Sequence, residues 1–212
     1  MDEEFKALLQ VIDEDVVQLC GKWKIYNQLF GSGQDNIELL NKSGSNVFSM
    51  LQILILDNVF LTLSKLTDPK KQGGHENTSI SNLLKQLSCS MDDELFVKLE
   101  TQLEELKTVC KNIRTHRNKS IAHSDISRVH KASTEFLPQI TYGEIEDALK
   151  ILREMMQDIT VLLFGGSSGY DPDIAYGHGT DKLFYVLRKG HERIADEKEV
   201  SVDLSEPPIR LN

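Results

Sequence analysis

The stretch that decides the fold is "FVKLETQLEELKTVCKNIRTHRNKSIAHSD", residues 96–125. Its apolar residues recur every three or four positions, which is the spacing of one face of an α-helix. These residues are Phe96, Leu99, Leu103, Leu106, Cys110 and Ile113. The next positions on the same face are Arg117, Ser120 and Ser124. The pattern therefore predicts a helix whose apolar face turns polar in its last turns.

The rest of the chain has the same helical period and no competing strand pattern. The spacing predicts helices over 2–30, 46–66, 79–87 and 180–190. Ser90 is expected to cap the helix that contains the opening stretch, and that helix should reach about residue 122. Thr141 and Glu144 have the spacing of a capping box, and the helix that they begin should end at Gly165.

These helices predict an all-α fold, an up-and-down bundle of four to five main helices with a short C-terminal helix and an extended tail. The expected organisation is a bundle over residues 1–165 and an appendage over 166–212 that packs on the bundle or extends from it. The loop at 70–79 is expected to be solvated, and the glycine-rich text at 164–172 to be a helix stop and linker.

The charge balance limits the partners that the chain as a whole attracts. The 212 residues carry a net charge of −9, so contact with nucleic acid needs a local basic patch. The apolar segment 47–66 contains four polar residues, which favours a buried core helix over a membrane span. They are Gln52, Asp57, Asn58 and Lys65.

The cysteines and the N-terminal residues indicate the cellular compartment in which the protein is expected. Cys20, Cys89 and Cys110 are odd in number and scattered among apolar residues, so they are expected to be buried thiols of a reducing compartment. The acidic N-terminus does not resemble a signal peptide. We therefore expect a cytoplasmic protein without membrane contact.

A basic patch does occur, between positions 107 and 124, where there is no acidic residue. It consists of Lys107, Lys111, Arg114, Arg117 and Lys119, together with His116 and His123. On one ideal helix Arg117 and His123 are about 120° apart around the axis and about 9 Å apart along it. They could converge if the helix breaks near His123, if the arginine side chain reaches round, or if two chains pair across this face.

Simpler interpretations of these residues stay open. Arg117 could pair with a core acid, for which Asp57 in the apolar helix is the obvious candidate, because buried charges are normally paired. A histidine near a helix end is often structural, and a basic run often forms a solvated helix end. His116, His123 and His130 are seven residues apart with no carboxylate at ligand spacing, so no metal and no cofactor is expected.

The text "RNKSIAH" resembles the signature of the HEPN superfamily, in which an arginine and a polar residue are followed several residues later by a histidine. Here these are Arg117, Asn118 and His123. Residues 39–69, 73–84 and 116–125 are similar to the HEPN-like abortive-infection U-type branch. The resemblance covers about residues 20–165.

The resemblance implies a helical homodimer in which the motifs of two chains face one cleft and cleave RNA without a metal. By position, Arg117 would hold the scissile phosphate, Asn118 would support it, and His123 would act on the 2′-hydroxyl or the leaving group. Asp57 loosely matches a supporting acidic position. The candidates for RNA binding are Lys111, Arg114, His116 and Lys119.

This chemistry agrees with the residue types. Cleavage of RNA by its own 2′-hydroxyl needs proton transfer and stabilisation of phosphorane charge, which histidine and arginine supply. The resemblance also implies phage defence or a toxin–antitoxin setting, with a cognate antitoxin as a partner. The alternative is a non-catalytic helical dimerisation or interaction module. In either case we expect the homodimer to form partly on the polar end of the helix face that carries Arg117.

Overall fold

The computed structural model describes residues 3–121, 137–166, 169–170 and 178–196, and this part of the chain is almost entirely helical. In chain order the helices are α1 (Glu3–Phe30), α2 (Gln34–Leu66), α3 (Ile80–Leu87), α4 (Asp93–Val109), α5 (Lys111–His116), the π-helical turn η1 (Arg117–Ile121), α7 (Tyr142–Phe164) and α8 (Thr180–Asp196). The all-α prediction is confirmed. The expected loop after α2 contains a small hairpin of two-residue strands, β1 (Lys71–Gln72) and β2 (His75–Glu76).

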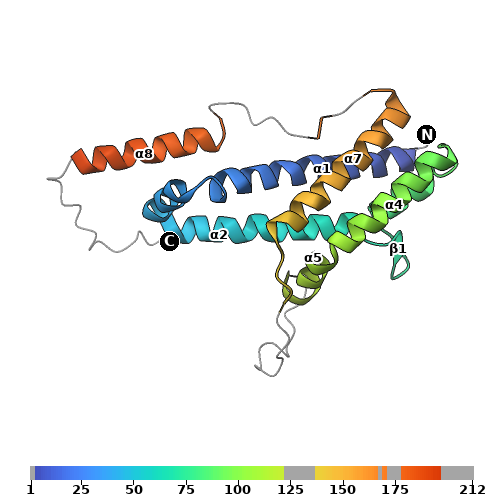
Figure 1. Ribbon diagram of the computed structural model, residues 1–212, viewed down its shortest axis with the longest axis horizontal. Helices are drawn as coiled ribbons and strands as arrows, with labels where there is room; N and C mark the ends of the chain where they lie inside the picture. The colour runs from blue at the N-terminus through green and yellow to red at the C-terminus, as the bar shows by residue number, and fades with distance from the viewer. Residues whose placement is uncertain (1–2, 122–136, 167–168, 171–177, 197–212) are drawn as a thin grey trace, which may run out of the picture.

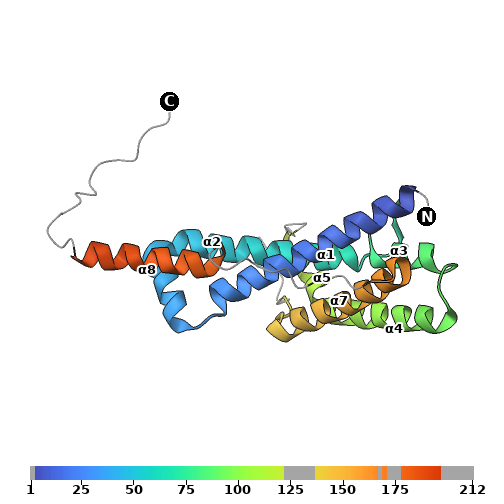
Figure 2. The same cartoon turned by 90° about the horizontal axis from the view of Figure 1, so that it is seen from above.

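The two longest helices set the shape of the molecule. α1 and α2 run antiparallel along the long axis, and α4 and α7 cross them at the end where α2 finishes (Figure 1). α8 lies along the opposite end of the pair, as the view from above also shows (Figure 2). The arrangement is a helical bundle with one added C-terminal helix.

The main core lies where α4 and α7 pack on α1 and α2. The apolar face of the opening stretch is buried there, as predicted, through Leu99, Leu103, Leu106, Cys110 and Ile113. Tyr170 extends this core beyond α7, and its hydroxyl donates a hydrogen bond to Asp13 at 2.6 Å. Burial of these side chains is the main force that holds the bundle together.

Helix boundaries follow the sequence signals in part. Thr141 and Glu144 form the predicted capping box, and Gly165 ends α7 with a φ of 68°, which favours glycine. The N-cap of α4 is Asp92 rather than Ser90, since the Asp92 carboxylate accepts the backbone N–H of Leu95 at 2.8 Å.

Two other boundaries differ from the prediction. The expected continuous helix is interrupted at Cys110 (φ −78°, ψ 2°) and ends in the π-helical turn η1. α8 continues past Gly190 to Asp196. Glycine is tolerated in a helix interior, and the residues that follow it are good helix formers.

α8 packs on a second, smaller core with Leu29 and Leu40 through its Phe184. The Thr180 hydroxyl donates to Gln28 Oε1 at 2.8 Å, and the ring of His191 hydrogen-bonds the Ser43 hydroxyl at 2.9 Å. These contacts attach the C-terminal helix to the last turn of α1 and to the first part of α2.

α2 departs most from the predicted burial. Its backbone breaks from helical geometry at Gly44 and then runs without interruption to Leu66. The part after this break was expected to be buried, but only 22% of its most apolar 18-residue window is. By length and composition alone this helix could cross a membrane. Polar contacts hold one side of it to α1, such as the hydrogen bond from Gln52 to the Tyr26 hydroxyl at 3.3 Å.

The three cysteines differ in burial. Cys20 and Cys110 are buried as expected, whereas Cys89, between α3 and α4, is exposed. On the same helix as Cys20, Trp23 is buried and Tyr26 stacks on it with ring centroids 5.1 Å apart.

Candidate functional site

The candidate site lies where the C-terminal end of α2 meets α5 and η1. Arg114 and Arg117 are three residues apart, so their side chains leave the same helical face. That face is the continuation of the buried apolar seam, and it meets the last turn of α2. Asp68 lies two residues after the last residue of α2 and precedes Pro69, which stops the helix.

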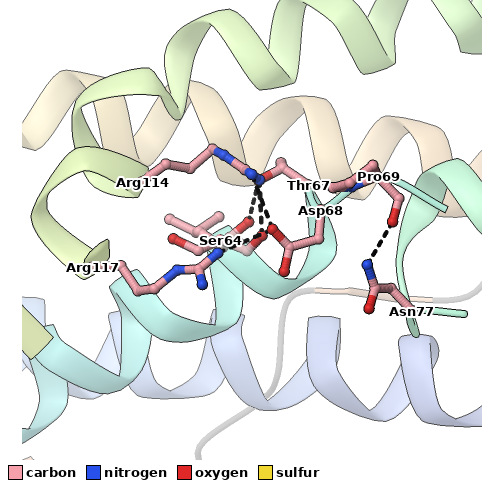
Figure 3. Close-up of polar contacts among 8 residues, drawn as sticks. Ser64, Thr67, Asp68, Pro69, Asn77, Arg114 and Arg117 are labelled. Carbon is pink, nitrogen blue, oxygen red and sulfur yellow. Dashed lines mark hydrogen bonds and ion pairs between the residues drawn. The ribbon is translucent and has the colours of Figure 1, made fainter. Parts of the chain in front are cut away.

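The two arginines converge on this one carboxylate (Figure 3). The Oδ1 atom of Asp68 lies 3.0 Å from Nη2 of Arg114 and 3.0 Å from Nη2 of Arg117. Arg114 also donates through Nη1 to the backbone carbonyl of Ser64 at 3.2 Å and to the hydroxyl of Thr67 at 3.0 Å. Arg114 is therefore fixed by three acceptors at the end of α2.

Burial makes these contacts stronger than those of a surface ion pair. The side chains are 17% exposed for Asp68, 28% for Arg114 and 23% for Arg117. Two cations share one anion, so the cluster keeps an excess positive charge. The Nε atom of Arg117 is buried and has no hydrogen-bond partner in the described structure. Arg117 is thus the less saturated of the two guanidinium groups.

The sequence assigned the arginine partner to the wrong acid. Asp57 lies about three turns before the end of α2, half-buried, and the structure places neither Arg114 nor Arg117 against it. Asp68 takes the role because α5 and η1 contact the last turns of α2. The polar turn of the seam is explained by this contact within one chain.

A basic groove of about 690 Å³ opens beside the ion pair. Its lining includes Lys107, Lys111, Arg114 and Asn118, with Thr67 and Pro69 on the α2 side. Lys107 is held by Glu104 at 2.7 Å, whereas Lys111 is exposed. The structure therefore brings three of the predicted site residues, Lys111, Arg114 and Asn118, to one groove.

Arg117 opens to a separate hollow of about 280 Å³ on the other side of Asp68. Leu61, Thr62 and Lys65 of α2 complete its lining. The ammonium group of Lys65 lies 2.6 Å from the carboxylate of Asp15 in α1. Two cations line this hollow, Lys65 and Arg117. Of the two, Arg117 shares its counter-ion, Asp68, with another arginine, Arg114.

The remaining predicted residues are placed differently. The ring of His116 packs against Phe60 of α2 with centroids 5.8 Å apart, which is a core-edge contact. Lys119 is half-buried within the π-helical turn. His123 and His130 lie outside the described residues, so the distance between His123 and Arg117 is untested.

Neighbouring groups hold this corner of the bundle rigid. Asn112 donates to Glu144 Oε1 at 2.7 Å, which ties α5 to the start of α7. The backbone N–H of Thr141, and then Asn112, lower the pKa of Glu144 below its ordinary value of 4.5. Burial raises the pKa of the Cys110 thiol to about 12, so this cysteine is an inert core residue.

Nothing in residues 3–121, 137–166, 169–170 and 178–196 brings three histidine, cysteine, aspartate or glutamate side chains together in a way that could hold a metal ion. His123 and His130, two members of the histidine series weighed from the sequence, are not among these residues.

The family comparison covers most of the chain. The family model HEPN_AbiU2, described as AbiU2, matches residues 2–179. The chain belongs to the AbiU2 family of HEPN proteins. No curated protein and no solved structure matches it. The resemblance inferred from Arg117, Asn118 and the α2 text is therefore confirmed at the level of the family, and it extends to the beginning of α1.

The acid of this AbiU2-family site was missed from the sequence, although a signal was present. Asp68 was considered only as part of the helix stop before Pro69. An aspartate at the C-terminal end of a helix lies against the negative end of the helix dipole, which is unfavourable unless a cation neutralises it. That conflict is a reason to look for an arginine partner at Asp68.

The face on which we expected a homodimer is occupied within the chain. The apolar part of the α4 and α5 seam is buried in the core, and its polar end, Arg117, is paired with Asp68. This removes the ground on which that face was predicted to be the interface.

Proposed function

We propose that this AbiU2-family protein is a metal-independent endoribonuclease whose catalytic groups are Arg117, Asn118 and His123. The observation that carries the proposal is the position of Arg117, whose guanidinium shares its counter-ion with Arg114 and lines an open hollow at the end of α2. Family membership supports the same chemistry, because the Arg117-to-His123 spacing is the HEPN signature.

In the proposed mechanism, Asp68 occupies Arg117 until an RNA phosphate binds there. A phosphodiester that approaches Arg117 competes with the Asp68 carboxylate for the same forked donors. Arg114 stays with Asp68, because it also has the Ser64 carbonyl and the Thr67 hydroxyl as acceptors. Arg117 then stabilises the extra negative charge of the phosphorane, and Asn118 donates to the same phosphate.

His123 is proposed to move the proton. Its imidazole titrates near neutrality, so it can take the proton of the 2′-hydroxyl or give one to the leaving 5′-oxygen. The attacking 2′-oxygen belongs to the RNA, and the phosphate is left as a 2′,3′-cyclic ester. None of these steps requires a metal.

The RNA strand is proposed to follow the basic groove. Lys111 and Arg114 line it and supply sequence-independent contacts to phosphates. His116 and Lys119, also proposed from the sequence, would act at its margin. Asp68 takes the supporting role that sequence analysis predicts for Asp57.

The biological setting is proposed from the family. An abortive-infection protein of HEPN type fits phage defence, and a cognate antitoxin protein that covers the basic groove would fit a toxin–antitoxin pair. We propose a cytoplasmic homodimer without membrane contact, in which the Arg117 sites of the two chains serve one RNA.

One observation favours the alternative, a non-catalytic interaction module. Arg114 and Arg117 are both partly buried in an ion pair with Asp68, as in a cluster that serves only to hold α5 against α2. The two functions differ in what Arg117 does: a structural arginine affects stability alone, whereas a catalytic one affects the rate.

Cleavage of mixed structured RNAs by purified protein in the presence of EDTA tests the proposal. Arg117→Ala and His123→Ala should each lose cleavage on the order of a hundredfold or more. Arg188→Ala, on α8, and His178→Ala, just before α8, are matched controls that should keep the wild-type rate. Cleavage that requires magnesium, or that persists in His123→Ala, contradicts the proposal and supports the interaction module.

A further inference from the structure

The outward face of α2 is apolar and is not covered by any described element. Between Lys42 and Asp57 the sequence has no charged residue. Val47, Met50 and Leu54 are 61%, 64% and 56% exposed, although each is a large apolar side chain. Leu51 and Leu61 are exposed on the same side of the helix. We call these five residues the α2 face.

This face is larger than a scattered set of surface residues. Its members fall within about 100° of one another around the helix and extend about 20 Å along it. Half-exposed side chains of this size present on the order of 500 Å² of apolar surface together, which is near the upper end of what monomeric proteins leave open. With its polar rim, such a patch approaches the roughly 800 Å² per partner of a standard protein interface.

We propose that the α2 face is the interface of a homodimer, in which two copies of α2 pack antiparallel about Leu54. The charge pattern supports a second copy as the occupant. A face without cations does not attract RNA, and a chain with a net charge of −9 repels another copy wherever acids meet. The α2 face is the long uncharged surface on which two such chains can approach each other.

The order of residues along α2 fits a two-fold axis at Leu54. In antiparallel pairing with Leu54 opposite its copy, Val47 of one chain lies opposite Leu61 of the other, and Met50 lies opposite Asn58. All of these positions are on the exposed side of the helix. Leu54 and the Val47–Leu61 pairs thus place apolar side chains opposite each other at the axis and on both sides of it, as a symmetric interface allows.

Asp57 favours the antiparallel over the parallel arrangement. It lies at the edge of the α2 face, half-buried. Parallel pairing sets the two Asp57 carboxylates directly opposite each other, and like charges at an interface are repulsive. Antiparallel pairing sets Asp57 opposite Leu51 instead and separates the two carboxylates.

The interface would also set the distance between the two proposed catalytic sites, an inference that rests on the proposed function. Leu61 belongs to the α2 face and also lines the hollow that holds Arg117. The two-fold axis of an antiparallel pair is perpendicular to both helices and relates the two Arg117 hollows. Along the helix axis the two hollows are about 20 Å apart at Leu61 and about 33 Å apart at Lys65, distances that one RNA strand can span.

Measurement of molar mass by size-exclusion chromatography with light scattering tests the interface. Wild-type protein should be a dimer at micromolar concentration, and Leu54→Glu should raise the dimer dissociation constant on the order of a hundredfold or more. Val97→Glu places the same charge at an exposed valine of α4 and should remain dimeric. Circular dichroism should show both variants folded, because both positions are exposed.

Cross-linking tests the direction of pairing. In a Cys89→Ser background, Leu54→Cys should be joined to its copy by a bismaleimide that spans about 8–10 Å, the usual distance between packed helices. Val47→Cys should not, because its two copies lie about 20 Å apart in the antiparallel pair. Equal cross-linking at both positions overturns the antiparallel arrangement.

Other outcomes overturn the interface itself. A monomeric wild-type protein, or a Leu54→Glu variant that remains dimeric, removes it. Binding of a monomeric wild-type protein to phosphatidylcholine vesicles assigns the α2 face to lipid instead. Because mass is measured without RNA, a protein that forms Leu54-dependent dimers but cleaves no RNA supports this interface and contradicts the proposed function alone.

Discussion

The Nη2 atom of Arg117 lies 3.0 Å from Oδ1 of Asp68, a residue 49 positions earlier in the chain. This contact joins the end of α2 to the turn that carries the family signature. It explains why an apolar seam ends in an arginine. It also places a cation at the C-terminal end of α2, where Asp68 and the negative end of the helix dipole would otherwise repel each other. The same contact keeps Arg117 partly buried until another anion replaces Asp68.

The ion-pair cluster should contribute to stability through Asp68. Asp68→Ala leaves Arg114 and Arg117 partly buried without a counter-ion, so it should lower the free energy of unfolding by about 1–3 kcal/mol. Asp57→Ala, at a half-buried aspartate within α2, is the matched control and should change the free energy of unfolding by less than about 0.5 kcal/mol. Urea unfolding followed by circular dichroism measures both. A larger loss for Asp57→Ala would restore Asp57 as the supporting acid.

The capping box of α7 should make stability depend on pH. Hydrogen bonds from Thr141 and Asn112 lower the pKa of Glu144 in the folded state. The resulting stabilisation is complete above the unfolded pKa, near 4.5, and is lost as the pH falls through the lower folded value. Glu144→Gln should therefore cost about 0.5–1 kcal/mol at pH 7 and progressively less below pH ~4.5.

Glu105→Gln removes an exposed charge from α4 and is the control for this measurement. Thermal unfolding of the three proteins between pH 3 and pH 7 gives the comparison. A Glu144→Gln deficit that stays constant across this range contradicts the role of the carboxylate charge.

The three cysteines should differ in reactivity. Cys89 is exposed, whereas burial raises the pKa of Cys110 to about 12 and Cys20 is also buried. Iodoacetamide at pH 8 should therefore modify Cys89 alone in the folded protein, and all three cysteines in urea. Mass spectrometry of tryptic peptides counts the modified sites. Labelling of Cys110 in the folded protein as fast as Cys89 would show that this part of the core opens readily.

The basic groove should control RNA affinity. Lys111→Ala removes an exposed cation from the groove and should weaken RNA binding and lower the salt dependence of the binding constant by about one phosphate contact. Lys85→Ala, at an exposed position of α3, is the matched control. Fluorescence anisotropy with a labelled RNA at several salt concentrations measures both effects. Equal losses in the two variants would mean that binding follows overall charge and not the groove.

Local patterns predicted the parts of this fold that local physics determines. The capping box at Thr141, the stop at Gly165 and the buried seam through Leu106 each follow from residues within a few turns of one another. The break at Cys110 and the π-helical turn at Arg117 had no such signal, because they depend on how α5 meets α2. The extension of α8 past Gly190 was missed because one glycine was given more weight than the helix formers after it.

The site shows the same division between local and distant information. The basic residues and the Arg117–Asn118 signature were visible in one continuous segment. Their acidic partner was not, because Asp57 and Asp68 are both compatible with the helical period and only the packing of α5 on the last turns of α2 selects Asp68. The exposed α2 face was predicted to be buried, because composition cannot distinguish an apolar surface that faces a core from one that faces a partner.

The most direct test of the central claim is the fate of the 2′-oxygen at the cleaved linkage. An RNA that the wild-type protein cleaves in EDTA should become resistant when the 2′-hydroxyl at that linkage is replaced by hydrogen, since the 2′-oxygen is the proposed nucleophile. The unmodified RNA should give a product that ends in a 2′,3′-cyclic phosphate, and Arg117→Lys should restore little of the rate lost in Arg117→Ala, because a point charge lacks the forked contact. Cleavage of the 2′-deoxy RNA at the same position and rate would contradict the mechanism.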